Sequence, residues 1–126
     1  MNNTARVLVA GHGSLPAAMV ASARMIGGEL ANLHSIGLEP GQSPQELAER
    51  FRGLLESHNP NIVLTDLAGG TPHNVARLVL RDHPDVALIS SVSLPLLLEL
   101  AFADAPLTAE SLDEAISATG ATLAVR

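Results

Sequence analysis

Three separated pieces of this sequence carry groups that could do chemistry together: a histidine, an aspartate and a glycine-rich loop. His12 lies between two glycines, directly after the apolar run of residues 7–10. Asp66 ends a second apolar run, and residues 67–72 then read Leu-Ala-Gly-Gly-Thr-Pro. A carboxylate that accepts a hydrogen bond from one imidazole nitrogen fixes the tautomer and leaves the other nitrogen with a free lone pair. If the fold brings His12 and Asp66 together, the histidine can therefore act as a nucleophile.

The glycine-rich loop is a candidate anion site formed by Gly69, Gly70 and Thr71. Glycine amides before a helix present unpaired N–H groups and the positive end of the helix dipole, and a threonine hydroxyl adds a donor. An oriented histidine beside such a cradle is what a phosphohistidine requires. The chain has no lysine, and neither loop has an arginine, so backbone amides would hold the phosphoryl oxygens. An ordinary turn, a capped helix and a hydrogen-bonded loop histidine would explain the same residues.

The elements around these loops predict how they are positioned. We expect strands over five segments, residues 7–10, 33–38, 61–66, 86–91 and 121–125. We expect helices after the capping residues Ser14, Ser43, Thr71 and Thr108, and a short helix over residues 94–103. The connections are too long for hairpins, which predicts an α/β fold with a doubly wound, mostly parallel sheet and helices on both faces. The last strand could pair at an edge or on another subunit.

This topology predicts that the histidine and the aspartate lie close together. In a doubly wound sheet the first and third strands can be neighbours at the point where strand order reverses, and ligands bind at the carboxyl ends of strands there. His12 would follow the first strand and Asp66 the third. The sequence therefore predicts one site at that edge of the sheet.

Composition bounds the remaining possibilities. A chain of 126 residues that is 47% hydrophobic and 16% charged predicts a single domain over residues 1–126. A net charge of −6 and 2% aromatic residues argue against binding nucleic acid. The absence of cysteine and lysine excludes thiolate chemistry, disulfides and lysine Schiff bases. We expect no cofactor and no metal, and a cytoplasmic location, because no signal peptide or membrane-spanning run is visible.

Three segments together resemble a known family. Residues 9–13 (Val-Ala-Gly-His-Gly), 64–72 (Leu-Thr-Asp-Leu-Ala-Gly-Gly-Thr-Pro) and 94–99 (Leu-Pro-Leu-Leu-Leu-Glu) are similar to the mannose-family IIA (EIIA) domain of the bacterial phosphoenolpyruvate-dependent sugar phosphotransferase system. The resemblance implies that His12 accepts a phosphoryl group from phospho-HPr and passes it to a IIB domain for sugar uptake. It implies that Asp66 orients His12 and that Thr71 with nearby amides contacts the phosphoryl group.

The resemblance also implies how the protein assembles. It implies a homodimer in which the last strand, residues 121–125, is exchanged between subunits. It implies no direct membrane insertion, and association with the membrane components IIC and IID through IIB. The sugar is not indicated, because selectivity would lie in those partners.

Four further residues beside the motifs are candidates for secondary roles at the site: Gly13, Ser14, His73 and Ser93. His73 stands where the family often has an aromatic residue, and Ser93 where it usually has asparagine. His73 could add a polar group near the site, but we expect an exposed histidine in the first turn of its helix.

Three other functions remain open on the sequence. The chain could be a phosphotransfer subunit serving a dihydroxyacetone kinase, although the Gly-Gly-Thr-Pro block favours the sugar-transport branch. It could be a regulatory or anion-binding module that keeps the cradle without being phosphorylated. It could also be a metal-dependent hydrolase that uses His12, Asp66 and His73, although three ligands around an open position are not convincingly assembled.

Overall fold

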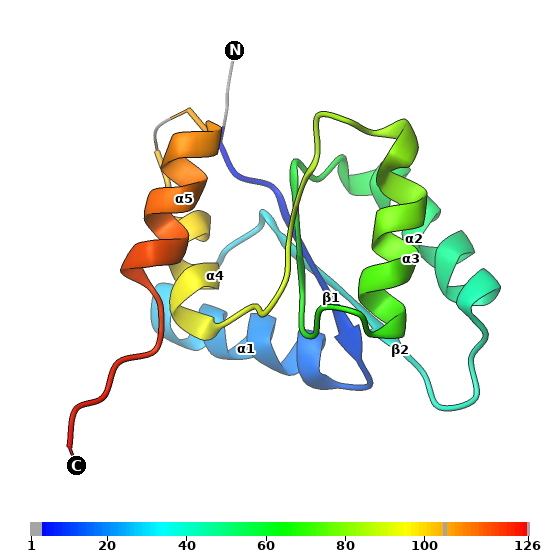
Figure 1. Cartoon of the computed structure of the whole chain (residues 1–126), viewed down its shortest axis with the longest axis horizontal. Helices are drawn as coiled ribbons and strands as arrows, with labels where there is room; N and C mark the ends of the chain where they lie inside the picture. Colours follow the sequence, from blue (N-terminus) through cyan, green and yellow to red (C-terminus); the bar gives the residue numbers. More distant parts are fainter. Residues whose placement is uncertain (1–3, 105, 126) are drawn as a thin grey trace.

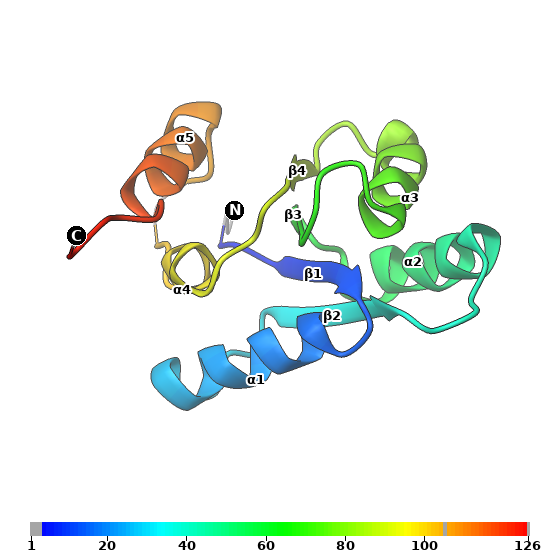
Figure 2. The same ribbon diagram turned by 60° about the horizontal axis from the view of Figure 1, so that its bottom comes forward.

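The chain forms one parallel sheet. The computed structural model describes residues 4–104 and 106–125. Within them four strands pair in the order β2-β1-β3-β4, all in parallel. They are β1 (Val7–His12), β2 (Leu33–Leu38), β3 (Ile62–Thr65) and β4 (Ala87–Ile89). Because β2 lies on one side of β1 while β3 and β4 lie on the other, the strand order reverses between β1 and β3, as predicted. Figure 1 shows β1 and β2 with the helices around them, and Figure 2 labels all four strands.

The helices cover both faces of this sheet. The described residues form α1 (Leu15–Gly27), α2 (Pro44–His58), α3 (Thr71–Val79), α4 (Leu94–Ala101) and α5 (Ala109–Ala118), with a 3₁₀ turn at Leu80–Asp82. Figure 2 shows α2 and α3 together on one side of the strands and α1, α4 and α5 on the other. The predicted doubly wound α/β architecture is therefore confirmed.

The two faces of β1 show why the sheet needs both layers. Val7 and Val9 pack into a core with α1, α4 and α5, whereas Leu8 and Ala10 pack into a core with α2 and α3. Successive side chains of a strand point to opposite faces, so a continuous apolar run is buried only when both faces are covered. β1 and β3 lie at the centre of the sheet, each paired with a strand on both sides, and their carboxyl ends carry the candidate site.

Ser14, Ser43 and Thr108 directly precede their helices as predicted, whereas the start of α3 is shifted by one residue. Ser43 and Thr108 cap α2 and α5, each with a reciprocal capping box. Ser14 does not cap α1 with its side chain, because its backbone is already helical (φ −86°, ψ −2°). Thr71 is the first residue of α3 rather than its cap, since Gly70 adopts the extended cap conformation with φ −73° and ψ 163°.

The edge beyond β4 differs most from the expected fold. β4 covers Ala87–Ile89, shorter than the predicted 86–91, and all its residues are half-buried. The predicted fifth strand is not formed within the described chain, where residues 121–125 have no regular structure. Leu123 and Val125 in this tail are 71% and 82% exposed. A single chain therefore leaves the outer edge of β4 without a strand partner among the described residues.

Candidate functional site

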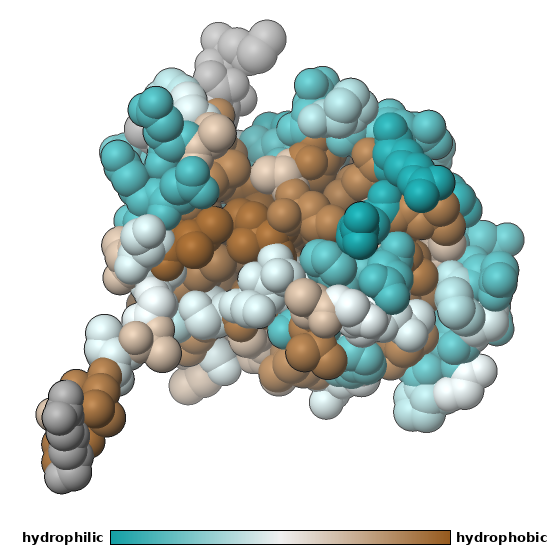
Figure 3. Space-filling view, in the orientation of Figure 1, coloured by the Kyte–Doolittle hydropathy of each residue, from teal (hydrophilic) through white to brown (hydrophobic). Residues whose placement is uncertain are grey.

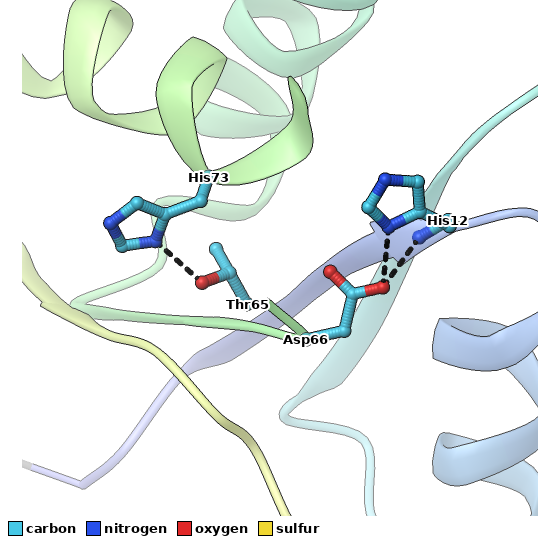
Figure 4. A network of polar contacts seen from close by, with 4 residues as sticks. All are labelled: His12, Thr65, Asp66 and His73. Carbon is cyan, nitrogen blue, oxygen red and sulfur yellow. Dashed lines mark hydrogen bonds and ion pairs between the residues drawn. The ribbon is translucent and has the colours of Figure 1, made fainter. Parts of the chain in front are cut away.

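His12 and Asp66 meet at the carboxyl ends of the two central strands. The His12 Nδ1 lies 2.8 Å from Asp66 Oδ2, and the His12 amide donates a hydrogen bond to the same oxygen at 2.9 Å (Figure 4). His12 is the last residue of β1, and Asp66 follows the last residue of β3. The two side chains that the sequence predicts to meet are thus in direct contact, 54 residues apart along the chain.

Sheet register and one glycine make this contact possible. Ala10 of β1 pairs with Thr65 of β3, and the Asp66 amide donates to the Ala10 carbonyl oxygen at 3.2 Å. This bond places the Asp66 side chain beside the end of β1. A Cβ added at Gly11 would lie 2.9 Å from both Asp66 Cγ and Oδ2, so the carboxylate occupies the space that any larger residue would fill.

Protonation at the pair is set by the carboxylate. Burial is the largest effect on the pKa of Asp66 and raises it, but the hydrogen bonds from the His12 ring and amide outweigh burial, and the pKa is lowered from 3.8. An ionised carboxylate only accepts hydrogen bonds, so His12 Nδ1 carries the proton and donates it. Nε2 is then left with a free lone pair on a side chain that is 47% exposed. Asp66 Oδ1 is buried and accepts no hydrogen bond from the described residues.

The start of α3 lies directly against the histidine ring. A Cβ added at Gly70 would lie 2.9 Å from His12 Cε1 and 3.5 Å from Nε2, so the free nitrogen faces the positive end of this nine-residue helix. The Gly70 amide donates to the Leu67 carbonyl oxygen at 3.1 Å and is therefore not free for an anion. Within the described chain, no hydrogen bond occupies the amides of Gly69 and Thr71. Of the three amides predicted to form the anion site, those of Gly69 and Thr71 are therefore available and that of Gly70 is not.

The secondary candidates occupy different positions. Gly13 and Ser14 are exposed directly after His12. Ser93 caps α4, with its hydroxyl accepting a hydrogen bond from the Leu96 amide at 3.2 Å. This hydroxyl has a local structural role at the helix start.

His73 does not lie where the sequence suggests. It is half-buried rather than exposed, and its Nδ1 lies 2.7 Å from the hydroxyl oxygen of Thr65 (Figure 4). Sequence reasoning missed Thr65 altogether. A single signal was available, namely a threonine inside an otherwise apolar strand, because such a buried hydroxyl needs a hydrogen-bond partner.

These positions bear on the metal-dependent hydrolase considered from sequence. The hydrolase alternative needs His73 to join His12 and Asp66, but its Nδ1 is engaged by Thr65 instead. Across residues 4–104 and 106–125, no three His, Asp or Glu residues are grouped so that they could hold a metal ion. In the same residues, no helix is long and apolar enough to cross a membrane.

Comparison with known proteins identifies the family. The model of the EIIA-man family, described as "PTS system fructose IIA component", matches residues 6–117. The sorbose-specific EIIA component of the phosphotransferase system (PTS) of Klebsiella pneumoniae is 33% identical over 109 residues, which are 85% of this chain and 80% of that protein. The fructose-specific EIIA component of Bacillus subtilis (strain 168) is 35% identical over 98 residues, 75% of this chain and 66% of that protein.

A solved structure agrees with these sequence relationships. The PTS IIA protein associated with the fucose utilization operon of Streptococcus pneumoniae superimposes with a TM-score of 0.80 at 31% identity. The superposition covers 97% of this chain and 96% of that one. The family match spans most of the chain, and the relatives are phosphotransfer components of sugar transport. The chain therefore belongs to the EIIA-man family and is a mannose-family EIIA component of a sugar phosphotransferase system.

Proposed function

We propose that His12 carries a phosphoryl group transiently, accepting it from phospho-HPr and passing it to a IIB domain or subunit for sugar uptake. The observation that carries this proposal is the 2.8 Å contact between His12 Nδ1 and Asp66 Oδ2, which leaves Nε2 as a free nucleophile beside the start of α3. Residues 1–126 act in this proposal as one carrier domain.

The transfer needs two substitution steps at phosphorus. In the first, the His12 Nε2 lone pair forms a bond to phosphorus while the N–P bond of the donor histidine breaks and its electron pair returns to the donor nitrogen. In the second, the nucleophile of IIB attacks phosphorus and Nε2 recovers its lone pair. The proton on Nδ1 stays in place throughout. Positive charge develops on the imidazole ring during the first step, and the Asp66 carboxylate stabilises it.

The start of α3 supplies the electrostatic partner for the phosphoryl oxygens. We assign the Gly69 and Thr71 amides and the Thr71 hydroxyl to this task, with the helix dipole adding positive potential. Gly70 contributes by lacking a side chain, because a Cβ there would lie against the His12 ring. Catalysis then rests on positioning and preorganised charge rather than on a proton donor.

Labelling His12 tests the proposal directly. Incubation with phosphoenolpyruvate, enzyme I and HPr is expected to place acid-labile, base-stable phosphate on the protein, as a phosphohistidine requires. His12→Ala is expected to abolish the label, because it removes Nε2. His83→Ala is the matched control, since His83 is an exposed histidine beyond α3 and its loss leaves the His12 contacts intact.

The outcomes separate the proposal from its rivals. Label that persists in His12→Ala would overturn the assignment of the acceptor nitrogen. An absence of label on the unmodified chain would favour the regulatory or anion-binding module instead. Adding a mannose-family IIB domain is expected to discharge the label, whereas retention of the label would argue against transfer to IIB.

A homodimer belongs to the same proposal. The outer edge of β4 has no strand partner within the described residues, and the tail of residues 121–125 exposes Leu123 and Val125. A hollow of about 770 Å³ lies between this edge and α5, lined in part by Val86, Leu107 and Leu112, and Figure 3 shows apolar surface there. We propose that the tail of a second copy pairs with β4 and covers this edge.

The oligomeric state of the full chain checks this arrangement. Sedimentation equilibrium is expected to give a dimer. Leu123→Asp is expected to shift the chain toward monomer, because a strand over residues 121–125 would bury that position. Thr122→Asp is the matched control, because its side chain would face the other side of the strand. A monomer at all concentrations would contradict the proposal.

A further inference from the structure

A second histidine contact lies beside the site and is not used by the proposed transfer. Thr65 is wholly buried, and it is the only buried polar side chain among the described residues. Its hydroxyl oxygen lies 2.7 Å from His73 Nδ1. In the rest of the described chain, no other hydrogen bond engages either side chain. The imidazole of His73 is therefore what satisfies this buried hydroxyl.

Thr65 is tied to the element that carries the candidate acid. It is the last residue of β3 and directly precedes Asp66. It pairs with Ala10 of β1, and its carbonyl oxygen accepts a hydrogen bond from the Val92 amide at 2.9 Å. Fixed on both sides by backbone pairing, Thr65 provides a rigid anchor at the base of the site.

His73 is tied to the element that carries the anion cradle. It lies in the first turn of α3, directly after Thr71 and Pro72. The Thr65–His73 hydrogen bond therefore joins the helix start to the strand end that bears Asp66. Figure 4 shows the His73 ring directed away from His12, on the far side of Thr65, so His73 does not itself reach the nucleophile.

We propose that His73 is a positioning residue that, through Thr65, sets the distance between the start of α3 and the His12–Asp66 pair. The inference rests on the proposed phosphoryl transfer and adds to it a residue outside the reacting groups. A misplacement of about 1 Å in a catalytic group can cost up to about 100-fold in rate, so a tether at this point affects the chemistry.

The tether is independent of the protonation of His73. A threonine hydroxyl both donates and accepts hydrogen bonds, and imidazole Nδ1 accepts when unprotonated and donates when protonated. The Thr65–His73 bond can therefore form with either the neutral or the cationic ring. An apolar aromatic ring at position 73 would fill similar space but would leave the Thr65 hydroxyl without a partner.

Three substitutions test the tether. His73→Phe keeps a ring and removes the hydrogen bond, Thr65→Val removes the hydroxyl at nearly constant volume, and His73→Asn keeps a polar atom two bonds from Cβ, as Nδ1 is. His12 phosphorylation is followed in single turnovers at varied concentrations of phospho-HPr. We expect His73→Phe to lower the maximal rate about threefold to tenfold while leaving the KM for phospho-HPr unchanged, because the helix start shifts but the docking surface does not.

Rescue and non-additivity distinguish positioning from general loss of stability. His73→Asn is expected to recover most of the rate, and Thr65→Val combined with His73→Phe is expected to be no slower than the slower single variant. His83→Phe serves as the matched control, since His83 is exposed and lies beyond α3. All variants are compared at a temperature at which circular dichroism shows them fully folded.

The possible failures are distinct. If the unmodified chain is labelled on His12 but His73→Phe matches His83→Phe in maximal rate, the positioning role is wrong and the proposed function stands. If the unmodified chain is not labelled, the proposed function fails. In that case ¹⁵N chemical shifts of the His12 ring still test the tether, which predicts that His73→Phe alters them and His83→Phe does not.

Discussion

The His12–Asp66 pair and the His34–His58 pair place an imidazole in opposite electrostatic environments. His12 ends β1, and its Nδ1 lies 2.8 Å from a carboxylate oxygen. His34 lies near the start of β2, and its ring stacks on that of His58, the last residue of α2, with 3.6 Å between ring centroids. One imidazole therefore faces an anion, and the other faces a second base.

These neighbours push the ring charge in opposite directions. Burial lowers the pKa of His34, and the neighbouring His58 imidazole and Arg24 guanidinium lower it further. At the other pair, the hydrogen bonds from His12 outweigh burial and lower the pKa of Asp66, so the carboxylate is ionised and stabilises a positive ring. A histidine that gains charge as its nitrogen is phosphorylated needs the environment of His12, and the environment of His34 opposes that charge.

Asp66→Asn makes the two pairs more alike by removing the anion. Asparagine keeps the size and one acceptor oxygen of the side chain, but it neither fixes the Nδ1 proton as firmly nor stabilises the charged ring. We expect the rate of His12 phosphorylation to fall about 10- to 100-fold, the range typical when the hydrogen-bond partner of a metal-bound imidazole is removed. Rapid-quench kinetics with phospho-HPr measures this effect.

The control for this prediction changes the same residue type away from the site. Asp113→Asn alters an exposed acid on α5 and is expected to leave the rate within about twofold of the unmodified chain. Equal rates for Asp66→Asn and the unmodified chain would remove the orienting role assigned to Asp66.

Gly70→Ala tests the comparison by crowding the His12 ring. The added Cβ would lie 2.9 Å from His12 Cε1, and the backbone of residue 70 has φ −73°, which alanine adopts without strain. We therefore expect the ring to rotate away from Asp66, with a loss of roughly tenfold in transfer rate, about 1.4 kcal/mol in the barrier. Single-turnover labelling reports the rate, and ¹⁵N shifts of the His12 ring report its altered hydrogen bond.

Gly53→Ala is the matched control for this substitution. A Cβ at Gly53, on the exposed face of α2, meets nothing within 4 Å. Alanine there should leave transfer unchanged and should stabilise the helix by about 0.5–1 kcal/mol, because glycine is unfavourable inside a helix. If Gly70→Ala transfers as fast as Gly53→Ala, the close packing of the α3 start on His12 does not matter for function.

The contact between His12 and Asp66 was predictable because it follows from topology. Apolar runs that end in His12 and Asp66 predict buried strands, and long connections predict a parallel sheet whose carboxyl ends meet. The sequence could not predict which backbone donors remain free. That depended on the turn in which the Gly70 amide bonds to Leu67, which moves the helix cap from Thr71 to Gly70.

Two contacts that the sequence did not predict, Thr65–His73 and His34–His58, depend on the directions in which side chains leave different elements. Thr65 and His73 are eight residues apart, but their contact depends on the path of the loop between β3 and α3. His34 and His58 lie on a strand and at the end of the next helix, where no periodicity relates their rings. The expected last strand is a different case, since residues 121–125 have no sheet partner in a single chain.

The His34–His58 pair is expected to make stability depend on pH in the range where histidines titrate. Because burial, His58 and Arg24 lower the pKa of His34 below 6.5, the unfolded chain binds more protons than the folded chain just below that pH. The free energy of unfolding should therefore be highest above about pH 6.5 and decrease as the pH falls below it. His58→Asn removes one cause and leaves burial and Arg24, so the pKa of His34 should rise partway toward 6.5 and the loss of stability in acid should shrink. Urea unfolding between about pH 5 and about pH 7.5, with NMR titration of His34, measures both effects.

His83→Asn is the control for this prediction, because it removes an exposed histidine and should leave the His34 titration unchanged. If His34 titrates identically in the unmodified chain, in His58→Asn and in His83→Asn, the stacked His58 ring has no electrostatic effect on His34.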